Sequence, residues 1–484
     1  MSLTSQADDS RPSPNDLARL SAAELMAGYR SGVFTPRDVI DEVIAALERT
    51  DRACKVMVEP LFEAARREAD AVTATWRAGE PTGPLAGVPV TIKDLVFVAG
   101  APARGGAPAN EGFVPQQDAA VVARLKVAGA IVTCKTTTCE AGYKLTADSP
   151  ISGITRNPWN LSRTSGGSSG GAAAAVAAGC GPVAVGTDGV GSIRVPSSFC
   201  GVFGIKPTFG LVPRSPGFSP PSWGSLAHTG PIARTVGDAA LMLGVIAGYD
   251  GRDGASLPVQ AQTYTATAGR LDGVRVAASV DLGHAAVEPD VRSAFAAAVD
   301  LLADLGAAVA PDHPGIDPEA LERTLKPIAL TEQAAAVNHR AAGDLGRSDA
   351  DYVAAVARGR SYSGIDYVEA GYRRGELRSA FLEQFRRADV LVTPTVAVTA
   401  FAAGTLGAPV VDGRPVDPHL GWSPFSWPIN LAGLPAATVP IGFDRDGLPI
   451  GLQIVAPWLG EALLLRIAAA LERGRPWQAR WPVL

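Results

Sequence analysis

The chain has 484 residues, of which 47 % are hydrophobic and 19 % are charged, so it can bury a large core and cannot be wholly disordered. Its formal net charge is −5 at pH 7 and it has no long basic run, which argues against a protein that mainly binds nucleic acid. Its uncharged stretches are interrupted by glycine, proline or threonine, and its polar N-terminus has no apolar signal segment, so we expect no membrane span.

Helical and strand patterns alternate along the chain. Residues 1–15 are expected to form a disordered or loosely attached leader, and Thr35-Pro36 predicts a helix start, with Thr as the N-cap and Pro at the first helical position. Apolar periodicity predicts helices over 39–47, 61–76, 121–127, 172–178, 235–246, 291–305 and 462–471, and mostly helix over 318–387. Strands are predicted over 88–98, 131–134, 183–185, 274–278 and 390–392, with a hairpin formed by 438–443 and 450–455.

This alternation favours an α/β layered fold with a largely parallel or mixed sheet. The Ala-, Thr- and Gly-rich stretch 254–270 is the best candidate for a domain boundary, but the predicted elements on its two sides have the same character. The sequence has no internal repeat and no clear linker. We therefore expect residues 16–484 to form one large domain.

The cysteines and histidines do not suggest a metal centre. The five cysteines form no C-x-x-C pair, and an odd number of widely spaced cysteines is typical of reduced thiols in a cytoplasmic protein. The five histidines are scattered, and none has metal-ligand spacing to a second histidine or cysteine. We expect no metal.

The segment TSGGSSGG at 164–171 is the most unusual part of the sequence. Glycine lets the backbone approach a ligand closely, and the helix predicted after this segment directs its positive N-terminal end toward the same loop. The residues alone leave three interpretations open: a catalytic loop, a loop that cradles phosphate, and a merely flexible loop.

The spacing Gly166-x-Ser168-x-Gly170 also matches the nucleophile elbow of α/β-hydrolases. That elbow requires a strand directly before the serine and a histidine later in the chain. Residues 157–163 are predicted to form a loop, and neither His339 nor His419 lies in a distinctive context. An α/β-hydrolase-like esterase is therefore the weaker alternative.

A second glycine-serine turn follows the strand predicted at 183–185. Its successive backbone N–H groups can converge on one point, which is the geometry of an oxyanion hole, and the candidate donors are Gly189, Val190, Gly191 and Ser192. Asp188 and Arg194 flank this turn with opposite charges. We expect them to form a structural ion pair that braces the loop.

A serine nucleophile needs a base, and no histidine lies near these segments in the sequence. A lysine can serve when burial lowers its pKa, because desolvation disfavours the ammonium form. Lys93 and Lys135 both lie in apolar, strand-like runs. The alternative for each is a lysine at a strand end whose amine reaches solvent, and spacing alone does not choose between the two.

These motifs together resemble the amidase signature family over nearly the whole chain from about residue 17. The matching blocks are RNPWN at 156–160, GGSSGG at 166–171, GTD at 186–188, GSIRVP at 191–196, FCG at 199–201, GIKPT at 204–208, GVP at 87–89 with Lys93-Asp94, GPIART at 230–235 and DGLPIGLQ at 446–453.

The resemblance implies an α/β/α layered fold with a central mixed β-sheet, a signature core at about 80–235 and a helical insert at about 318–387. It also implies a Ser-Ser-Lys triad in which Lys93 is the base, Ser168 the bridging residue after a cis peptide bond, and Ser192 the nucleophile. Ser169 would support this triad through a hydrogen bond. The resemblance prefers Lys93 over Lys135 and implies no metal or organic cofactor.

Two positions depart from the family pattern. Members usually carry Gly-Gly-Ser at the nucleophile turn, where this chain has Val190-Gly191-Ser192. Valine does not adopt a positive φ comfortably, so we expect Val190 to narrow the site. Cys139 also stands where members more often have another residue, and we expect it either to line the substrate pocket or to be an inert small hydrophobic residue.

The resemblance implies an amidohydrolase that cleaves C–N bonds of amides and of carbamates (urethanes) through an acyl-enzyme. The expected partner is a small-molecule amide or carbamate, with neither nucleic acid nor membrane, and the expected state is a monomer or homodimer. The alternative from another class is a transamidation subunit of the glutamine amidotransferase type that needs a partner chain.

Overall fold

The computed structural model describes all residues except 1–16, 82, 219–224, 261 and 339–344. The expected leader at 1–15 lies outside the described residues. Within the described part, no helix combines the length and the apolar character that crossing a bilayer requires.

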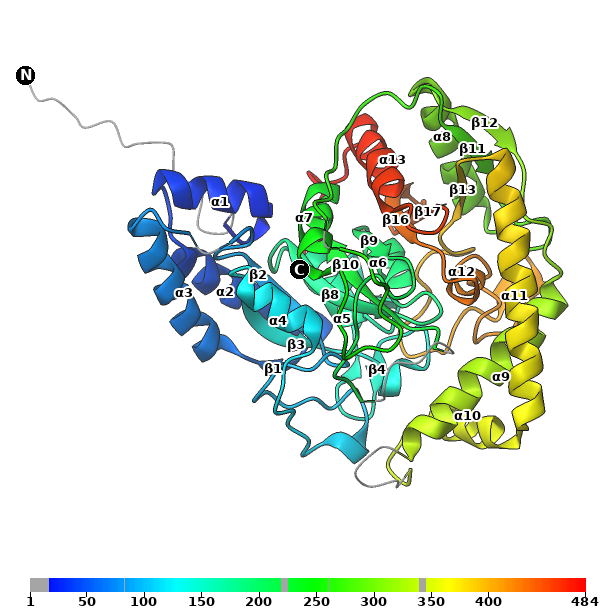
Figure 1. Ribbon diagram of the computed structural model, residues 1–484, viewed down its shortest axis with the longest axis horizontal. Helices are drawn as coiled ribbons and strands as arrows, with labels where there is room; N and C mark the ends of the chain where they lie inside the picture. Colours follow the sequence, from blue (N-terminus) through cyan, green and yellow to red (C-terminus); the bar gives the residue numbers. More distant parts are fainter. Residues whose placement is uncertain (1–16, 82, 219–224, 261, 339–344) are drawn as a thin grey trace, which may run out of the picture.

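A central mixed sheet of eleven strands is the core of the fold (Figure 1). Its strands, in spatial order, are β1 (Met57–Pro60), β3 (Ile131–Thr136), β2 (Pro89–Lys93), β8 (Val183–Asp188), β10 (His228–Ala233), β9 (Phe203–Lys206), β16 (Ala436–Phe443), β17 (Pro449–Val455), β13 (Val390–Pro394), β11 (Arg275–Ala278) and β12 (Ala308–Pro311). The pairs β2–β3, β2–β8, β11–β12 and β11–β13 are parallel, and the other neighbours are antiparallel.

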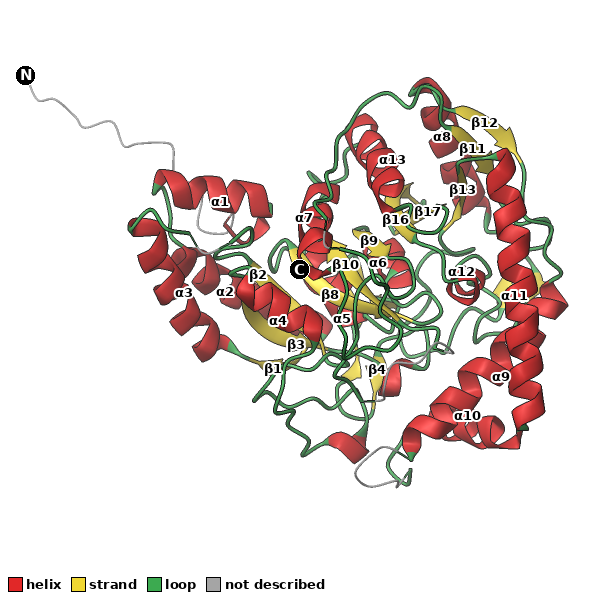
Figure 2. Cartoon of the chain, viewed as in Figure 1, coloured by secondary structure: helices red, strands yellow, loops and turns green. Residues whose placement is uncertain are grey.

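Helices cover both faces of this sheet (Figure 2). One layer contains α4 (Ala120–Val127), α7 (Val236–Ile246), α8 (Pro289–Asp304) and α13 (Glu461–Gly474), and the other contains α2 (Pro36–Cys54), α5 (Gly170–Ala177) and α6 (Arg194–Cys200). Three further helices are α1 (Ala22–Ser31), α3 (Phe62–Arg77) and α12 (Trp427–Ala432). The α/β/α layering with a central mixed sheet is therefore confirmed.

The stretch predicted to be mostly helical forms an arm at one side of the molecule (Figure 1). It comprises α9 (Pro318–Val337), α10 (Ala350–Ser361) and α11 (Gly364–Arg387), and α9 packs against both of the others. Short two-stranded sheets accompany the main sheet in the described structure: β4 (Asp148–Ser149) with β5 (Gly153–Ile154), β6 (Arg156–Asn157) with β7 (Asn160–Thr164), and β14 (Val410–Val411) with β15 (Arg414–Pro415).

Most predicted elements are present at nearly their expected bounds. Thr35 caps α2 as expected, because its side chain accepts a hydrogen bond from the N–H of Asp38 and the Asp38 carboxylate accepts the N–H of Thr35. The prediction was wrong at two places. The strand expected over 88–98 ends at Lys93, where the chain turns, and residues 157–163 contribute to the β6–β7 hairpin instead of a loop.

The sheet brings two loops to one edge. Because β2 and β8 are parallel neighbours, their carboxyl ends meet at the same side of the sheet. Lys93 is the last residue of β2, and Asp188 is the last residue of β8. The loop between β7 and α5, which carries the GGSSGG motif, reaches this same edge, since Ser168 and Ser169 contact Lys93 there.

Candidate active site

Lys93 lies fully buried at the edge of the sheet and contacts both serines of the glycine-rich loop. Its Nζ atom is 2.7 Å from Ser168 Oγ and 2.9 Å from Ser169 Oγ, and it lies 3.4 Å from the carbonyl oxygen of Thr187. Ser169 Oγ in turn donates to that carbonyl and accepts the N–H of Thr187. Ser169 therefore fixes the amine against the end of β8 and leaves Ser168 on its other side.

The environment of Lys93 favours the neutral amine. No ion pair to Lys93 is present among the described residues, and its side chain is fully buried. Burial lowers the pKa of Lys93 to about 7, although the nearby Cys139 and Asp188 oppose this shift. An amine with such a pKa can accept a proton near neutrality, as a general base must.

Lys135 is equally buried but differently paired. Its Nζ atom is 3.0 Å from Asp94 Oδ1, so it forms a buried ion pair. The other oxygen of Asp94 accepts the backbone N–H groups of Arg104 and Gly105. Neither lysine reaches solvent, so the alternative of a strand-end lysine with a solvent-exposed amine was wrong for both. Of the two, Lys93 is the one in contact with the serines, and Lys135 holds the adjoining loop in place.

The glycine-rich loop passes through a space that only a glycine backbone fits. The Gly167–Ser168 peptide bond is cis, as the resemblance implied. A Cβ atom on Gly167 would lie 2.2 Å from the carbonyl carbon and oxygen of Thr146, so any side chain there would collide with the backbone. This close approach places Ser168 directly before the first turn of α5.

Ser192 lies on the turn between β8 and α6. Its side chain is 2 % exposed, and its Oγ atom has no hydrogen-bond partner among the described residues. Its carbonyl oxygen accepts the N–H of Ser169 at 3.1 Å, which ties this turn to the glycine-rich loop. The structure thus brings Lys93, Ser168, Ser169 and Ser192 together, with the Ser192 hydroxyl not yet hydrogen-bonded to Ser168.

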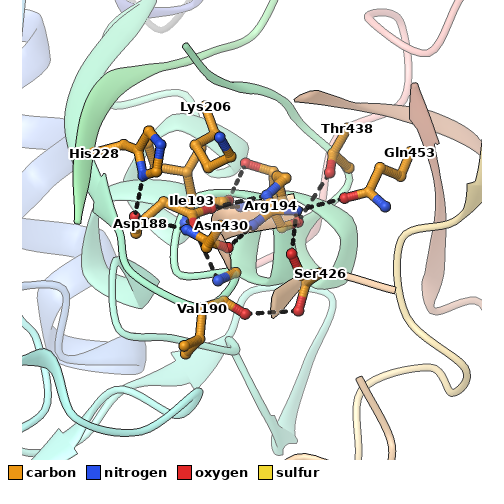
Figure 3. Close-up of polar contacts among 12 residues, drawn as sticks. Asp188, Val190, Ile193, Arg194, Lys206, His228, Ser426, Asn430, Thr438 and Gln453 are labelled. Carbon is orange, nitrogen blue, oxygen red and sulfur yellow. Dashed lines mark hydrogen bonds and ion pairs between the residues drawn. The ribbon is translucent and has the colours of Figure 1, made fainter. Parts of the chain in front are cut away.

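A buried carboxylate organises the Ser192 turn (Figure 3). The two oxygens of Asp188 accept hydrogen bonds from Nε and Nη2 of Arg194, both at 3.0 Å, so the expected ion pair is present and bidentate. The same carboxylate accepts backbone N–H groups from Gly191, Ile193 and Arg194. Burial raises the pKa of Asp188, but the Arg194 guanidinium, the nearby Lys206 and the Asn430 amide hold it well below its usual range.

Residues from the far end of the chain complete this network (Figure 3). Asn430, on α12, donates through Nδ2 to the carbonyl oxygen and the carboxylate of Asp188. Arg194 Nη1 donates to the carbonyl oxygen of Ser426 and to Oε1 of Gln453. The Ser426 hydroxyl donates to the carbonyl oxygen of Val190 at 2.7 Å. Sequence reasoning missed Ser426 and Asn430, because their roles depend on long-range contacts and no local motif marks them. It also missed the contact of the Thr187 carbonyl with Lys93, although Thr187 lies in the GTD block.

The set of expected oxyanion donors is smaller than the sequence suggested. The N–H of Gly191 donates to Asp188 Oδ1 at 2.8 Å, so it is committed to the network and does not face a substrate. The N–H groups of Gly189, Val190 and Ser192 have no acceptor among the described residues. The positive φ of the turn, 133°, falls on Gly191 and not on Val190, so the valine adopts an ordinary backbone conformation.

A cavity of about 210 Å³ opens onto the serine loop. Its wall includes Ser168, Thr187 and Gly189. A second cavity of about 380 Å³ shares Gly189 with the first and is lined by Val190, so this valine does shape the space beside the Ser192 turn.

Cys139 lines neither of these cavities. It is fully buried, its Sγ atom contacts the backbone of Lys144, and it packs among Tyr143, Ala334 and Val337. Of the two interpretations of Cys139, its burial in this hydrophobic cluster favours the inert small hydrophobic residue. All five cysteines are free and buried.

The residues of the α/β-hydrolase alternative do not assemble here. His339 lies outside the described residues. His419 lies on the wall of the second cavity, and no hydrogen bond joins it to Ser168 or Ser192 within the described part of the chain. The β6–β7 hairpin that precedes Ser168 is separate from the central sheet, whereas an elbow serine follows a sheet strand directly. Among the described residues, no group of three His, Cys, Asp or Glu side chains could hold a metal ion.

Comparison with known sequences identifies one family over most of the chain. The sequence matches the Amidase family over residues 38–465. It is 36 % identical to an acylamidase of Rhodococcus erythropolis, with 96 % of this chain and 97 % of that protein covered. It is also 37 % identical to a subunit of the glutamyl-tRNA(Gln) amidotransferase of Acidothermus cellulolyticus, with 95 % of each chain covered.

Comparison with solved structures points the same way. A bacterial aryl acylamidase of the amidase signature enzymes superposes with a TM-score of 0.89 at 30 % identity, over 95 % of this chain and 97 % of that chain. A 6-aminohexanoate cyclic dimer hydrolase in complex with its substrate superposes with a TM-score of 0.87 at 31 % identity, over 96 % and 99 % of the two chains.

The buried Asp188–Arg194 pair gives a stability prediction. Arg194→Met leaves the Asp188 carboxylate buried without its cation, so we expect the free energy of unfolding to fall by about 3–5 kcal/mol, measured by urea denaturation. The matched control is Arg270→Met, which removes an exposed ion pair with Asp272 and should leave the free energy of unfolding nearly unchanged. Equal losses in the two variants would contradict the organising role of Asp188.

Proposed function

The chain belongs to the amidase signature family, and on that premise we propose that it hydrolyses the C–N bonds of amides with Lys93 as base, Ser168 as proton bridge and Ser192 as nucleophile. The observation that carries this proposal is the 2.7 Å contact between Ser168 and a fully buried lysine that has no ion pair within the described part of the chain. No metal or organic cofactor takes part in this scheme.

The first step is the activation of Ser192. Neutral Lys93 accepts the hydroxyl proton of Ser168 while Ser168 Oγ takes the proton of Ser192 Oγ. This transfer requires the Ser192 side chain to rotate toward Ser168, because its hydroxyl has no hydrogen-bond partner among the described residues. Catalytic hydrogen bonds often form fully only when substrate is bound. The carbonyl oxygen of Ser192 is already tied to the N–H of Ser169, so the rotation needs no movement of the loop.

The second step is attack and collapse. Ser192 Oγ forms a bond to the substrate carbonyl carbon, and the negative charge that develops on the carbonyl oxygen is stabilised by backbone N–H groups. Gly189, Val190 and Ser192 supply these donors, and removing one such donor typically costs about 3–4 kcal/mol of transition-state stabilisation. The C–N bond then breaks as the leaving nitrogen receives the proton from Lys93 through Ser168. Water releases the acyl group by the reverse route.

The same attack suits carbamates. A carbamate presents a planar carbonyl between N and O, and the acyl-enzyme becomes a carbamoyl-enzyme. We therefore propose small carbamates, including urethanes, as a second substrate class, and a small molecule rather than a nucleic acid or a membrane as the partner. Five buried free thiols suit a reducing compartment, so we propose a cytoplasmic enzyme that acts as a monomer or homodimer.

A second candidate function, that of a transamidation subunit, is favoured by the likeness to amidotransferase subunits. The chain is 35 % identical to a subunit of the glutamyl-tRNA(Gln) amidotransferase of Synechococcus sp., over 94 % of this chain and 97 % of that protein, a likeness close to that of the acylamidase. In this alternative the same serines would release ammonia from an amide for use by a partner chain. The isolated chain would then hydrolyse amides poorly and gain activity when the partner is added.

The triad gives the first activity prediction. We expect Ser192→Ala to lower kcat by at least about 10⁴-fold, and Ser168→Ala and Lys93→Met by about 10²–10⁴-fold, in a discontinuous assay of amine release. The Ser168→Ala/Lys93→Met double variant should be no slower than the slower single variant, because the residues act as a unit. Ser279→Ala, a buried serine beside β11, is the control and should retain normal turnover. A Ser192→Ala protein with a near-normal rate would refute the assignment.

The second activity prediction concerns pH. Since Lys93 must be neutral to act as base and its pKa lies at about 7, we expect kcat/KM to rise with pH through about 7 and then reach a plateau. The profile is measured with a neutral anilide, so that only the enzyme titrates. A rate that is highest in acid and falls through neutrality would contradict Lys93 as base.

The third activity prediction concerns substrates. We expect the purified chain to hydrolyse activated aryl amides and small aryl or alkyl carbamates with release of free amine. Hydroxylamine added during turnover should capture the acyl- or carbamoyl-enzyme as a hydroxamate or hydroxyurea. If neither class is hydrolysed, and glutamine-dependent transamidation occurs once a partner chain is added, the second candidate is correct instead.

A further inference from the structure

An arginine shares the cavity that opens onto the serine loop. The wall of the 210 Å³ cavity that carries Ser168 and Gly189 also carries Arg214, from the loop after β9, together with Glu332, from α9. Arg214 takes no part in the chemistry proposed above, so its presence beside the reacting groups needs a separate explanation.

The guanidinium of Arg214 retains most of its capacity to donate hydrogen bonds. Within the described part of the chain, its one side-chain hydrogen bond runs from Nη1 to Ser225 Oγ at 3.0 Å, although a guanidinium has five N–H donors. The backbone N–H of Arg214 donates to Asp253, which anchors the residue through its main chain. The remaining side-chain donors are therefore available to a ligand in the cavity.

Two carboxylates lie near Arg214, and each already accepts hydrogen bonds from other groups. Glu332 accepts the hydroxyl of Tyr367 at 3.3 Å, and its charge interacts with the nearby guanidinium groups of Arg214 and Arg374. Both carboxylate oxygens of Asp253 accept backbone N–H groups, from Arg214 and Ala255. No ion pair joins the Arg214 guanidinium to either carboxylate among the described residues. Burial lowers the pKa of Arg214, so its charge lies in poorly hydrated surroundings.

We propose that Arg214 binds a carboxylate of the substrate, so that the preferred amides of this enzyme are anionic ones with a carboxylate a short distance from the scissile bond. This inference rests on the proposed amidohydrolase function. A guanidinium matches the two oxygens of a carboxylate with parallel N–H donors, and this bidentate pairing is among the strongest side-chain interactions. Because Arg214 and Ser168 line the same cavity, the carboxylate and the scissile carbonyl of such a substrate would lie in one continuous space.

The test compares binding of matched ligand pairs to the Ser192→Ala protein, which removes turnover from the measurement. The first pair places the charge on the acyl side: glutaric acid mono-4-nitroanilide against the neutral isostere 5-methylhexanoyl 4-nitroanilide. The second pair places it on the amine side: N-butyryl-4-aminobenzoate against N-butyryl-4-isopropylaniline. Dissociation constants are measured by titration calorimetry.

We expect the carboxylate member of one pair to bind about tenfold or more tightly than its neutral isostere. Adding Arg214→Met should abolish this preference without weakening the neutral ligand, Arg214→Lys should retain part of it, and Arg386→Met, an exposed arginine on α11, should leave it unchanged. A preference below twofold in both pairs, or one that persists in the Arg214→Met protein, would overturn the proposal.

Glu332→Gln supplies a result that does not depend on the folding of the Arg214 variants. It removes a negative charge from the same wall, so carboxylate binding should become tighter, and unchanged or weaker binding would count against the proposal. The failure of this inference is distinct from failure of the proposed function. Turnover of neutral anilides without a carboxylate preference contradicts only the role of Arg214. A carboxylate preference without amide turnover by the unmodified chain contradicts only the amidohydrolase function.

Discussion

The buried amine of Lys93 is the constraint on which the rest of this site depends. An ammonium group in a fully buried position without an ion pair is costly, so burial lowers the pKa of this lysine to about 7. The surrounding groups suit this state: two serine hydroxyls and a backbone carbonyl surround Nζ, and they can hydrogen-bond to a neutral amine. The charge of the neighbouring Lys135 is instead balanced by the carboxylate of Asp94 at 3.0 Å, and this ion pair gives Lys135 a structural role.

A second constraint keeps the turn that carries Ser192 fixed beside this amine. Asp188 ends the strand next to that of Lys93, and its carboxylate both pairs with Arg194 and caps three N–H groups of the turn. Asn430 and Ser426 close the network from α12 and the residue before it, so the C-terminal third of the chain holds a turn formed in its first half. Asp188 accepts the N–H of Gly191, whereas the N–H groups of Gly189, Val190 and Ser192 have no acceptor among the described residues. A buried charge pair thus orders the turn that carries Ser192.

Local signals account for the parts that were predicted correctly. The capping of α2 by Thr35 and the β16–β17 hairpin depend on residues a few positions apart, and the family motifs preferred Lys93, which contacts Ser168. The role of Ser192 stays a prediction. Burial and long-range pairing decided the rest. The apolar run after Lys93 predicted a longer strand, but its residues form a turn that packs in the core. Cys139 packs in a separate hydrophobic cluster. The contacts of Asn430 span 242 residues, which no local pattern can reveal.

The most direct test of this account is a titration of Lys93 itself. The chain has only seven lysines, so ¹³C labelling of lysine side chains gives a spectrum simple enough to assign, with the Lys93→Met protein identifying the signal that disappears. Lys206 is a second buried lysine with a lowered pKa, and it serves as an internal reference. The account predicts that the Lys93 side chain titrates near 7 in the intact free protein. A Lys93 that remains protonated until above about pH 10, as an ordinary lysine does, would contradict it.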